Sequence, residues 1–492
     1  MAQVKTLTGP WTLTLPEPLY QRLHAHLFPG DGDEHGAVIL AGVARDQRGA
    51  RLLAREIHLA QDGIDYVPGQ RGYRMLKADF IRDLILRARD QRLSYLAVHN
   101  HGGRLDVEFS GDDLRSHERG YPALLDIAAG MPVGALVFAR EAVAGDIWLP
   151  AGERSELRSA SIVGRRIRHL AASPRALSAV SPLKYDRQAR LLGAGGNEIL
   201  RQLRVGIIGL GGVGSLLVEY LARLGVGGMI VVDPDRVDLT NLPRMPGATQ
   251  WDALAVLTAE GRPEWLRRLG RRLATKKVTL ARRVALRANP NLAFTAIDGD
   301  IADADVAARF TGVDYLFLAA DSMQARLVAN AIVHQYLIPG VQMGAKATPD
   351  PTTGRLAQVF SVVRPINPAS GCLWCSGLVS PSRLQEEGLS ESERRAQLYV
   401  DDVDIVAPSV ITLNAVAAAH AANDFLFAVT GLTSETAALD YMRHDALGRA
   451  TQWDEPADDS GCLECGIADP SRRARGDGAE LPTRFRGRRG AA

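Results

Sequence analysis

A glycine-rich stretch between residues 204 and 244 constrains the fold of this chain most strongly. It begins with an apolar run from Val205 to Ile208, continues through Gly209, Gly211, Gly212 and Gly214, and leads into a segment of helical period from Leu216 to Leu224. Glycines suit such a turn because side chains would keep backbone N–H groups away from a phosphate, and the helix N-terminus adds partial positive charge. The order of strand, turn and helix predicts a nucleotide site on a doubly wound α/β sheet.

The residues after the next buried strand distinguish two classes of nucleotide-binding enzyme. This strand, from Gly228 to Val232, ends in Asp233, which lies 19 residues beyond Gly214 and could accept hydrogen bonds from a ribose. Up to this point a nicotinamide dehydrogenase is as good an interpretation as an ATP-dependent enzyme. The residues that follow include Asp235, Asn241 and Arg244. An arginine binds phosphate oxygens in a bidentate manner, and hydride transfer requires none there, so ATP is favoured.

The run from Asp233 to Arg244 resembles the ThiF/MoeB and ubiquitin-activating adenylyltransferases in residue order and spacing. The resemblance extends from about Tyr185 to Cys465. It implies ATP and Mg²⁺ as cofactors, with Asp321 as the magnesium ligand and Lys277 as a phosphate contact. It also implies that Arg187 reaches from one subunit into the ATP site of another, and hence a homodimer. A solvated lysine, a register in which Lys276 takes this part, and a helix-capping Asp321 are the alternatives.

Four cysteines form two pairs of the pattern CxxC, Cys372 with Cys375 and Cys462 with Cys465. Two such pairs in a cytosolic protein favour a structural zinc site with four thiolates over disulfide bonds. One redox-active pair without zinc is the alternative. If all four thiols bind zinc, no cysteine is left as a nucleophile, and an adenylated substrate passes directly to an external acceptor.

A second candidate site lies near the N-terminus, where a short strand from Tyr95 to Val98 runs into His99-Asn100-His101. Alternation places His99 and His101 on one face of an extended chain, where two imidazoles can share a metal ion. Asp113 could complete a His₂Asp set with an open position for water, which is the geometry of catalytic zinc. Glu34 is the candidate general base, and Ser110 could stabilise a developing oxyanion.

The pattern of Glu34, His99, His101, Ser110 and Asp113 resembles the JAMM/MPN metalloprotease motif. Members of that family cut peptide or isopeptide bonds after ubiquitin-like tails. One departure is Gly102, where the family usually has proline, which puts the rigidity of the loop in question. Two surface histidines beside an ordinary helix cap, and a binding module that keeps the ligands without cutting, are the alternatives.

Four segments are predicted along the 492 residues. These are a JAMM/MPN-like metalloprotease domain (1–155), a helical linker (156–183), a ThiF/MoeB-like adenylyltransferase domain (184–468) and an Arg-rich disordered tail (469–492). The segment 245–275 is longer than the family typically carries, and its role is not readable. A net charge of +2 argues against nucleic acid as a partner. No apolar run of about 18 residues and no N-terminal signal pattern are present, which predicts a cytoplasmic protein without a membrane contact.

These observations predict a mixed α/β domain followed by a Rossmann-like doubly wound domain with a structural zinc site. The function they favour is a bifunctional enzyme of a ubiquitin-like pathway. One activity would adenylate the C-terminal glycine of a ubiquitin-like or sulfur-carrier protein ending in Gly-Gly, and the other would process or remove that protein with zinc. A conjugating enzyme or a sulfur donor is a further possible partner. Sulfur-carrier activation in biosynthesis and a non-catalytic scaffold for ubiquitin-like proteins are the alternative functions.

Overall fold

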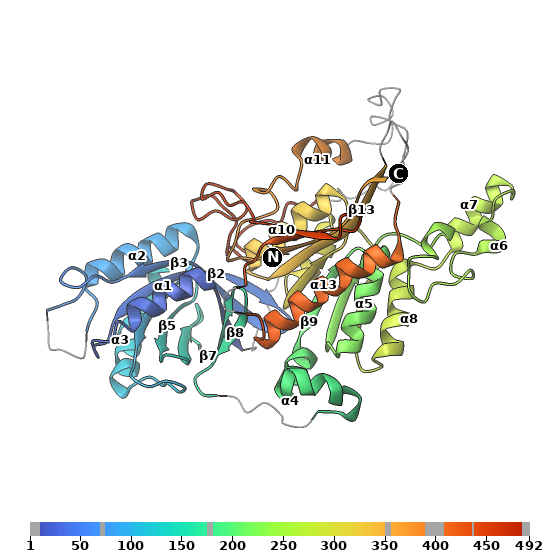
Figure 1. The fold of residues 1–492 in the computed structure, drawn as a ribbon. Coiled ribbons are helices and arrows are strands. Elements are labelled where there is room, and N and C mark those ends of the chain that lie inside the picture. The colour runs from blue at the N-terminus through green and yellow to red at the C-terminus, as the bar shows by residue number, and fades with distance from the viewer. Residues whose placement is uncertain are drawn as a thin grey trace. The chain divides into compact units, whose positions relative to one another are not determined.

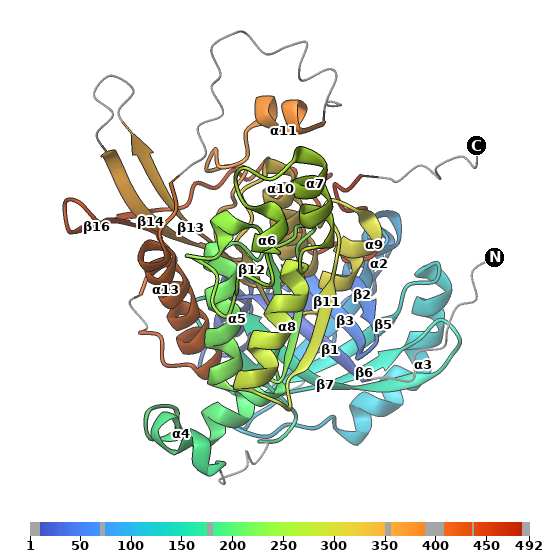
Figure 2. The same cartoon turned by 90° about the vertical axis from the view of Figure 1, so that its right-hand side faces the viewer.

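The computed structural model describes residues 10–68, 74–174, 181–349, 356–388, 408–434 and 437–484. The chain divides into two compact units, which are drawn from two directions in Figures 1 and 2. Unit 1 comprises Met1–Leu177, His334–Leu337 and Ser460–Glu480, and unit 2 comprises Ser178–Val333, Ile338–Asp459 and Leu481–Ala492. None of the helices within the described ranges has the length and apolarity needed to cross a membrane.

Unit 1 is built on an eight-stranded mixed sheet in the order β1-β3-β2-β4-β5-β6-β7-β8, and β7 also pairs with β1, so the sheet closes on itself. Its elements are β1 (Trp11–Pro16), α1 (Glu17–Leu27), β2 (Gly36–Asp46), β3 (Gly49–Leu59), α2 (Ala78–Gln91), β4 (Ser94–Asn100), α3 (Gly111–Ile127), β5 (Val133–Phe138), β6 (Val143–Trp148), β7 (Arg154–Val163) and β8 (Ile167–Leu170). The mixed α/β character predicted for this part of the chain is confirmed.

The core of unit 1 lies on both faces of this sheet because successive strand residues point to opposite sides. On β2, Ile39 packs with α1 in the core on one face of the sheet, which is called the inner core here. Its neighbours Val38 and Leu40 pack with α2 and α3 in the outer core, and these two helices flank the sheet in Figure 1. Within the ladder of β2 and β4, Gly36 lies opposite His99. The start of β2 therefore lies beside the end of β4.

The helical linker predicted for residues 156–183 is wrong for its first part. Strand β7 begins at Arg154 and β8 ends at Leu170, so the sheet continues beyond the boundary predicted at residue 155. Leu157, Ala160 and Ile162 are buried within β7. The polar residues between them lie on the exposed side of the strand, whereas their charge suggested a solvated linker.

The disordered tail predicted from residue 469 is also wrong as far as Arg484, and residues 485–492 lie outside the described ranges. Within unit 1, Gly476 forms a bridge with Val43, and Ala474 is fully buried. The arginines that made this segment look solvated bind other groups of the unit instead. For example, Arg472 Nε donates to Glu464 Oε1 at 2.8 Å.

Unit 2 contains a second eight-stranded sheet in the order β11-β10-β9-β12-β13-β14-β15-β16. Its strands run parallel from β11 to β13 and antiparallel from β13 to β16. Its elements are η1 (Leu183–Tyr185), α4 (Asp186–Gln202), β9 (Arg204–Ile208), α5 (Gly212–Leu224), β10 (Gly228–Val232), η2 (Leu239–Asn241), α6 (Ala255–Thr258), α7 (Glu264–Leu273), α8 (Lys277–Ala288), β11 (Ala293–Ile297), α9 (Ala304–Ala307), η3 (Ala308–Phe310), β12 (Tyr315–Leu318), α10 (Met323–Tyr336), β13 (Gly340–Pro349), β14 (Leu356–Ile366), α11 (Pro381–Gly388), α13 (Ile411–Thr430), β15 (Tyr441–Asp445) and β16 (Ala450–Asp454).

This strand order confirms the Rossmann-like doubly wound fold. From β9 the chain crosses through α5 to β10 on one side, while β12 pairs with the other side of β9. Connections that leave β9 and β12 in opposite directions open a crevice at their carboxyl ends, where such sheets bind nucleotides. Helices α5, α8 and α13 lie side by side (Figures 1 and 2). Phe425 of α13 packs on Tyr315 of β12, with ring centroids 5.0 Å apart.

We expect Gly42→Ala to destabilise unit 1 by about 1–3 kcal/mol, because its new Cβ would lie 2.0 Å from the carbonyl oxygen of Ala474. Gly120→Ala is the matched control, since Gly120 is exposed within α3 and its Cβ would meet nothing. Alanine there should be neutral or stabilise by up to about 1 kcal/mol. Urea unfolding followed by circular dichroism measures both. An unchanged midpoint for Gly42→Ala would mean that residues 469–480 do not pack on β2.

Candidate functional site

A pocket of about 1070 Å³ in unit 2 is lined by the residues at the carboxyl ends of β9, β10 and β12. The structure brings nearly all of the predicted nucleotide-site residues together around it. Those that line the pocket are Gly209, Gly211, Gly212, Asp233, Asp235, Asn241, Arg244, Lys277 and Asp321. Gly214 and Arg187 are not among the lining residues.

The glycines after β9 have distinct steric reasons. Gly209 has a φ of 90°, and a Cβ there would lie 2.7 Å from the backbone nitrogen of Ala320. A Cβ on Gly214 would lie 2.0 Å from the carbonyl oxygen of Gly209, inside the turn itself. A Cβ on Gly211 would meet no atom within 4 Å. Gly209 and Gly214 therefore allow the turn to form, whereas Gly211 leaves space open at the pocket wall.

Asp233 is buried and holds this turn through its carboxylate. Its Oδ2 accepts the N–H of Leu210 at 2.7 Å, and its Oδ1 accepts the N–H of Asp235 at 2.9 Å. Burial raises the pKa of Asp233, and Lys277 together with these two N–H donors opposes that rise. Each oxygen has a further lone pair, so the ribose contact predicted from the sequence is compatible with the bonds to the backbone.

Cationic and acidic side chains share the pocket wall. Lys277 Nζ lies 2.7 Å from Asp235 Oδ2 and 3.7 Å from Asp233 Oδ1. Lys276 forms an ion pair with Asp298 and does not line the pocket, so the geometry favours Lys277 as the phosphate contact. Asp321 is exposed three residues beyond the end of β12, where its carboxylate is accessible to a cation. These donors suit a polyphosphate with a magnesium ion.

Sequence reasoning missed several residues that line the same pocket. Arg364 of β14 donates to Gln342 of β13 at 2.7 Å. Glu387 of α11 accepts the N–H groups of Met323 and Gln324 at 2.7 and 2.9 Å, and thereby caps α10. Asn414, in the first turn of helix α13, abuts the glycine turn, because a Cβ on Gly212 would lie 2.1 Å from its Nδ2. The sequence did not single out Asn414, because His420, Asn423 and Asp424 are further polar residues of the same helix.

The three candidate metal ligands of unit 1 converge, with their ligand atoms all within 4.8 Å of one another. The Nε2 atoms of His99 and His101 lie 3.2 Å apart. Asp113 places its Oδ1 3.6 Å from His99 Nε2 and its Oδ2 3.3 Å from His101 Nε2. Tetrahedral zinc with bonds of about 2.0–2.1 Å separates its ligands by about 3.3 Å. The three donors therefore fit a zinc ion in kind and in spacing.

The groups around these donors prepare them for a metal ion. His101 Nδ1 donates to the carbonyl oxygen of Glu108 at 3.0 Å, which leaves the Nε2 lone pair of a neutral ring for a metal. Burial alone would raise the pKa of Asp113, but the neighbouring rings of His101 and His99 and a hydrogen bond from Ser110 hold it well below its usual range. Glu34 Oε1 lies 3.8 Å from His101 Nε2, and burial raises the pKa of Glu34 against the opposing effect of both histidines.

Ser110 has a structural role as the helix cap of α3, which its position in the sequence also suggested. Its Oγ accepts the N–H of Asp113 at 3.1 Å and donates to Asp113 Oδ2 at 2.7 Å, which caps α3. The carboxylate of Asp113 thus belongs both to the helix cap and to the candidate metal ligands, and the oxyanion role of Ser110 stays a prediction.

Further along α3, the Nδ1 of His117 bonds Asp146 at 2.9 Å, and Asp146 also accepts bonds from Trp148 and Arg154.

The two cysteine pairs belong to different units. In unit 2, the Sγ atoms of Cys372 and Cys375 lie 3.6 Å apart, and the N–H of Cys375 points to the Sγ of Cys372 at 3.4 Å. In unit 1, the N–H of Glu464 points to the Sγ of Cys462 at 3.4 Å. Each pair thus contains a turn in which a backbone N–H supports a sulfur atom, and zinc binding stays a proposal.

A family model decides the class of unit 2, because residues 185–464 match the model of the ThiF family. This match covers more than half of the 492 residues. The chain belongs to the ThiF family. The match begins at residue 185, so it does not include Glu34, His99, His101 or Asp113. The peptidase interpretation of residues before 185 rests on the geometry of unit 1.

Three curated relatives are similar to part of this chain. The chain is 34% identical over 157 residues to the molybdopterin-synthase adenylyltransferase of Escherichia coli (strain K12), covering 32% of this chain and 55% of that protein. It is 29% identical over 178 residues to the tRNA threonylcarbamoyladenosine dehydratase of Bacillus subtilis (strain 168), covering 36% and 62%. It is 32% identical over 139 residues to the ubiquitin-like modifier-activating enzyme 5 of Oryza sativa subsp. japonica, covering 27% and 30%.

Among solved structures, that of E. coli MccB with ATP is 18% identical to this chain with a TM-score of 0.42, covering 58% of this chain and 75% of that chain. The chain spans at most 62% of the length of the three curated relatives. The activity and the substrates of this chain are therefore matters for a proposal.

The glycine turn gives a paired prediction. Gly211→Ala should fold with an unchanged melting temperature yet bind Mg-ATP about tenfold more weakly, because its Cβ would stand at the open pocket wall. Gly214→Ala should lower the melting temperature, because its Cβ would collide with the Gly209 carbonyl. Calorimetric titration and thermal unfolding separate the two effects. Unchanged ATP affinity in Gly211→Ala would place the phosphates elsewhere.

The buried Asp146 gives a prediction about acid stability. Burial alone would raise its pKa, but bonds from His117, Arg154 and Trp148 lower it from 3.8 to about 2. A depressed pKa stabilises the fold above the unfolded value, by about 2 kcal/mol here, and this contribution is lost as pH falls from about 4 to 2. Urea unfolding of wild type and Asp146→Asn should differ most at pH 7, and the difference should shrink below pH 4 and be nearly gone at about pH 2. A constant difference across this range would contradict the assignment.

Proposed function

We propose that this ThiF protein adenylates the C-terminal glycine of a ubiquitin-like or sulfur-carrier protein in unit 2, and cleaves a peptide or isopeptide bond after such a tail in unit 1. The convergence of polyphosphate-binding residues at the switch point of the unit 2 sheet carries the first half of this proposal. The convergence of His99, His101 and Asp113 beside Glu34 carries the second half.

In the adenylation step, a carboxylate oxygen of the terminal glycine attacks the α-phosphate of ATP. A bond forms between that oxygen and phosphorus, the bond from the α-phosphorus to the bridging oxygen breaks, and pyrophosphate leaves. The step needs positive charge and fixed geometry more than a protein nucleophile. Arg244 and Lys277 would neutralise the phosphates, and Asp321 would hold Mg²⁺ at the pocket wall. The exposed Arg187 would act on the pocket of a second copy in a homodimer.

The acyl adenylate would pass to an acceptor outside this chain. The sequence contains four cysteines, all within the two CxxC pairs. We assign them to a structural zinc site, which the spacing and the sulfur-directed N–H groups of each pair support. Coordinated thiolates are committed to the metal and do not serve as nucleophiles. A conjugating enzyme, a sulfur donor or an amine would then take the acyl group.

In the cleavage step, His99, His101 and Asp113 would hold a zinc ion, which when bound activates water and polarises the scissile carbonyl. Glu34 would take a proton from the attacking water and return it to the leaving amine. Ser110 keeps Asp113 in position through the bonds that cap α3. Activation of sulfur carriers in biosynthesis is the second candidate function, favoured by the relative that is a molybdopterin-synthase adenylyltransferase.

Two variants should separate the two activities. Asp321→Ala should abolish ATP–pyrophosphate exchange and leave cleavage intact, whereas Glu34→Gln should keep its zinc and lose cleavage by at least about 100-fold. The substrate is a ubiquitin-like protein ending in Gly-Gly for exchange, and the same protein with a peptide extension for cleavage. Intact mass measures both products and any adduct on the enzyme.

Asp305→Ala and Glu153→Gln are the matched controls, because these exposed acids neither line the pocket nor belong to the candidate metal ligands. Loss of both activities in a folded Asp321→Ala would contradict the independence of the units. A covalent adduct on the enzyme would show that one of the cysteines is a nucleophile after all. Binding of the ubiquitin-like protein with neither reaction would favour a scaffold.

A further inference from the structure

A buried amide lies between the two candidate zinc ligands of β4. Asn100 is 7% exposed and stands between His99 and His101 in the sequence. Because side chains alternate along a strand, Asn100 points to the face opposite the two histidines and does not share their ligand site. A buried amide needs hydrogen-bond partners, and those of Asn100 lie in a segment far from it in sequence.

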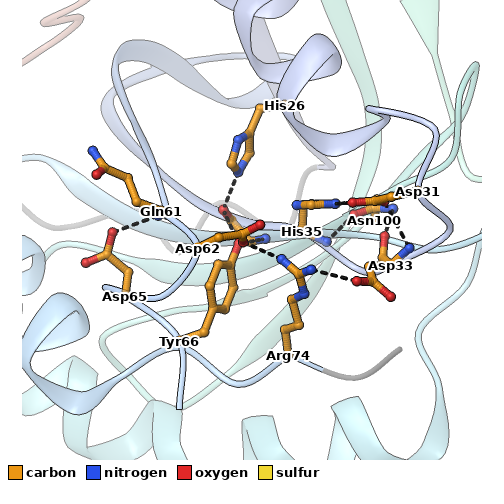
Figure 3. A network of polar contacts seen from close by, with 11 residues as sticks. His26, Asp31, Asp33, His35, Gln61, Asp62, Asp65, Tyr66, Arg74 and Asn100 are labelled. Carbon is orange, nitrogen blue, oxygen red and sulfur yellow. Dashed lines mark hydrogen bonds and ion pairs between the residues drawn. The ribbon is translucent and has the colours of Figure 1, made fainter. Parts of the chain in front are cut away.

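Both ends of the Asn100 amide bind the backbone on either side of Glu34. Its Oδ1 accepts the N–H of His35 at 2.6 Å, and its Nδ2 donates to the carbonyl oxygen of Asp33 at 3.4 Å. These two groups belong to the peptide units directly before and after Glu34. One side chain therefore brackets the proposed general base, and Figure 3 shows Asn100 with Asp33 and His35.

The two Asn100 hydrogen bonds lie beyond the end of the regular ladder between β2 and β4. The ladder between β2 and β4 ends at the pair of Gly36 and His99, and Glu34 lies two residues before β2 begins. No strand pairing of the described sheet therefore includes the Glu34 backbone. The Asn100 side chain extends the pairing of the two strands beyond the last ladder position.

Neighbouring contacts hold the residues around Glu34 by other means, as Figure 3 shows. Arg74 binds Asp33 at 2.6 Å, and Asp31 binds the ring of His35 at 3.0 Å. The hydroxyl of Tyr66 accepts the N–H of Gly36 at 2.7 Å. The side chains of Asp33 and His35 therefore bind other groups, while Oε1 of Glu34 lies 3.8 Å from Nε2 of His101.

We propose that Asn100 is a positioning residue that fixes the carboxylate of Glu34 relative to His99 and His101. The proposal rests on the zinc-dependent cleavage proposed above. A general base works only when held within about 0.5 Å of its productive position. Since Asn100 is bonded in the chain to both histidines, any small shift of β4 carries the backbone of the base with it.

The test compares Asn100→Ala with Val98→Ala in the zinc-loaded full chain. Val98 is 2% exposed on the same strand and the same face, and it packs in the inner core, so its truncation controls for loss of stability. Three readouts apply. They are zinc affinity by chelator competition, hydrogen exchange of the His35 amide, and kcat and KM for a ubiquitin-like protein extended beyond its Gly-Gly.

Both variants should keep zinc affinity within about threefold of wild type, because the three ligands remain. Only Asn100→Ala should lose protection of the His35 amide, and it should lose about 100-fold in kcat with KM unchanged, as expected for a displaced base. Asn100→Asp, which keeps an acceptor for His35 and lacks the donor to Asp33, should keep the protection and lose less in kcat. This variant also decides the matter if Asn100→Ala does not fold.

Three results would overturn the role of Asn100 and leave the proposed cleavage standing. The first is that the wild type cleaves while Asn100→Ala has the same kcat as Val98→Ala. The second is that Asn100→Asp equals the wild type both in kcat and in exchange of the His35 amide. A protected His35 amide in Asn100→Ala would overturn it as well. A wild type that binds zinc and does not cleave would instead overturn the proposed peptidase function, and the role of Asn100 with it.

Discussion

The carboxylate of Asp233 supports the nucleotide side of unit 2 because it joins the turns that follow two adjacent strands. Its oxygens hold the glycine turn after β9 through Leu210 and the segment after β10 through Asp235. A buried carboxylate is costly unless it is paired and hydrogen-bonded, and here backbone donors and Lys277 meet that need. The shape of the ThiF pocket, and the position of the lysine that would contact phosphate, therefore depend on one buried acid.

Unit 1 uses a comparable principle with a different chemistry. The alternation of side chains along β4 divides His99-Asn100-His101 between two tasks, with the imidazoles on one face and the amide on the other. The helix cap of α3 brings in Asp113, whose carboxylate both closes the cap and faces the two rings. In both units, a strand end supplies the chemical groups, and hydrogen bonds to the adjoining backbone fix them.

Patterns among neighbouring residues, such as apolar runs and alternation, predicted part of the fold. The strand from Gly228 to Val232 was predicted with the bounds that the structure has, because an apolar run ends there in Asp233. His99 and His101 were predicted to share one face of the chain because period-two alternation needs only neighbouring residues, and their role as metal ligands stays a prediction. The strands between 154 and 170 and the ordered segment 469–484 were missed, because distant strands and carbonyl groups stabilise them. Arg364, Glu387 and Asn414 were missed for the same reason, since only the fold brings them to the pocket.

The division of labour on β4 restricts how this part of the chain can vary in length. Inserting or deleting one residue between Ser94 and Val98 would turn the imidazoles toward the backbone of Glu34 and the amide toward the ligand face. Homologous chains that retain the site should therefore differ in substitutions along this strand and accumulate insertions in the loop from residue 102 to 106, before the Glu108 carbonyl that binds His101. Gly102, at the start of that loop, then marks the boundary between an element of fixed length and one whose length is free to drift.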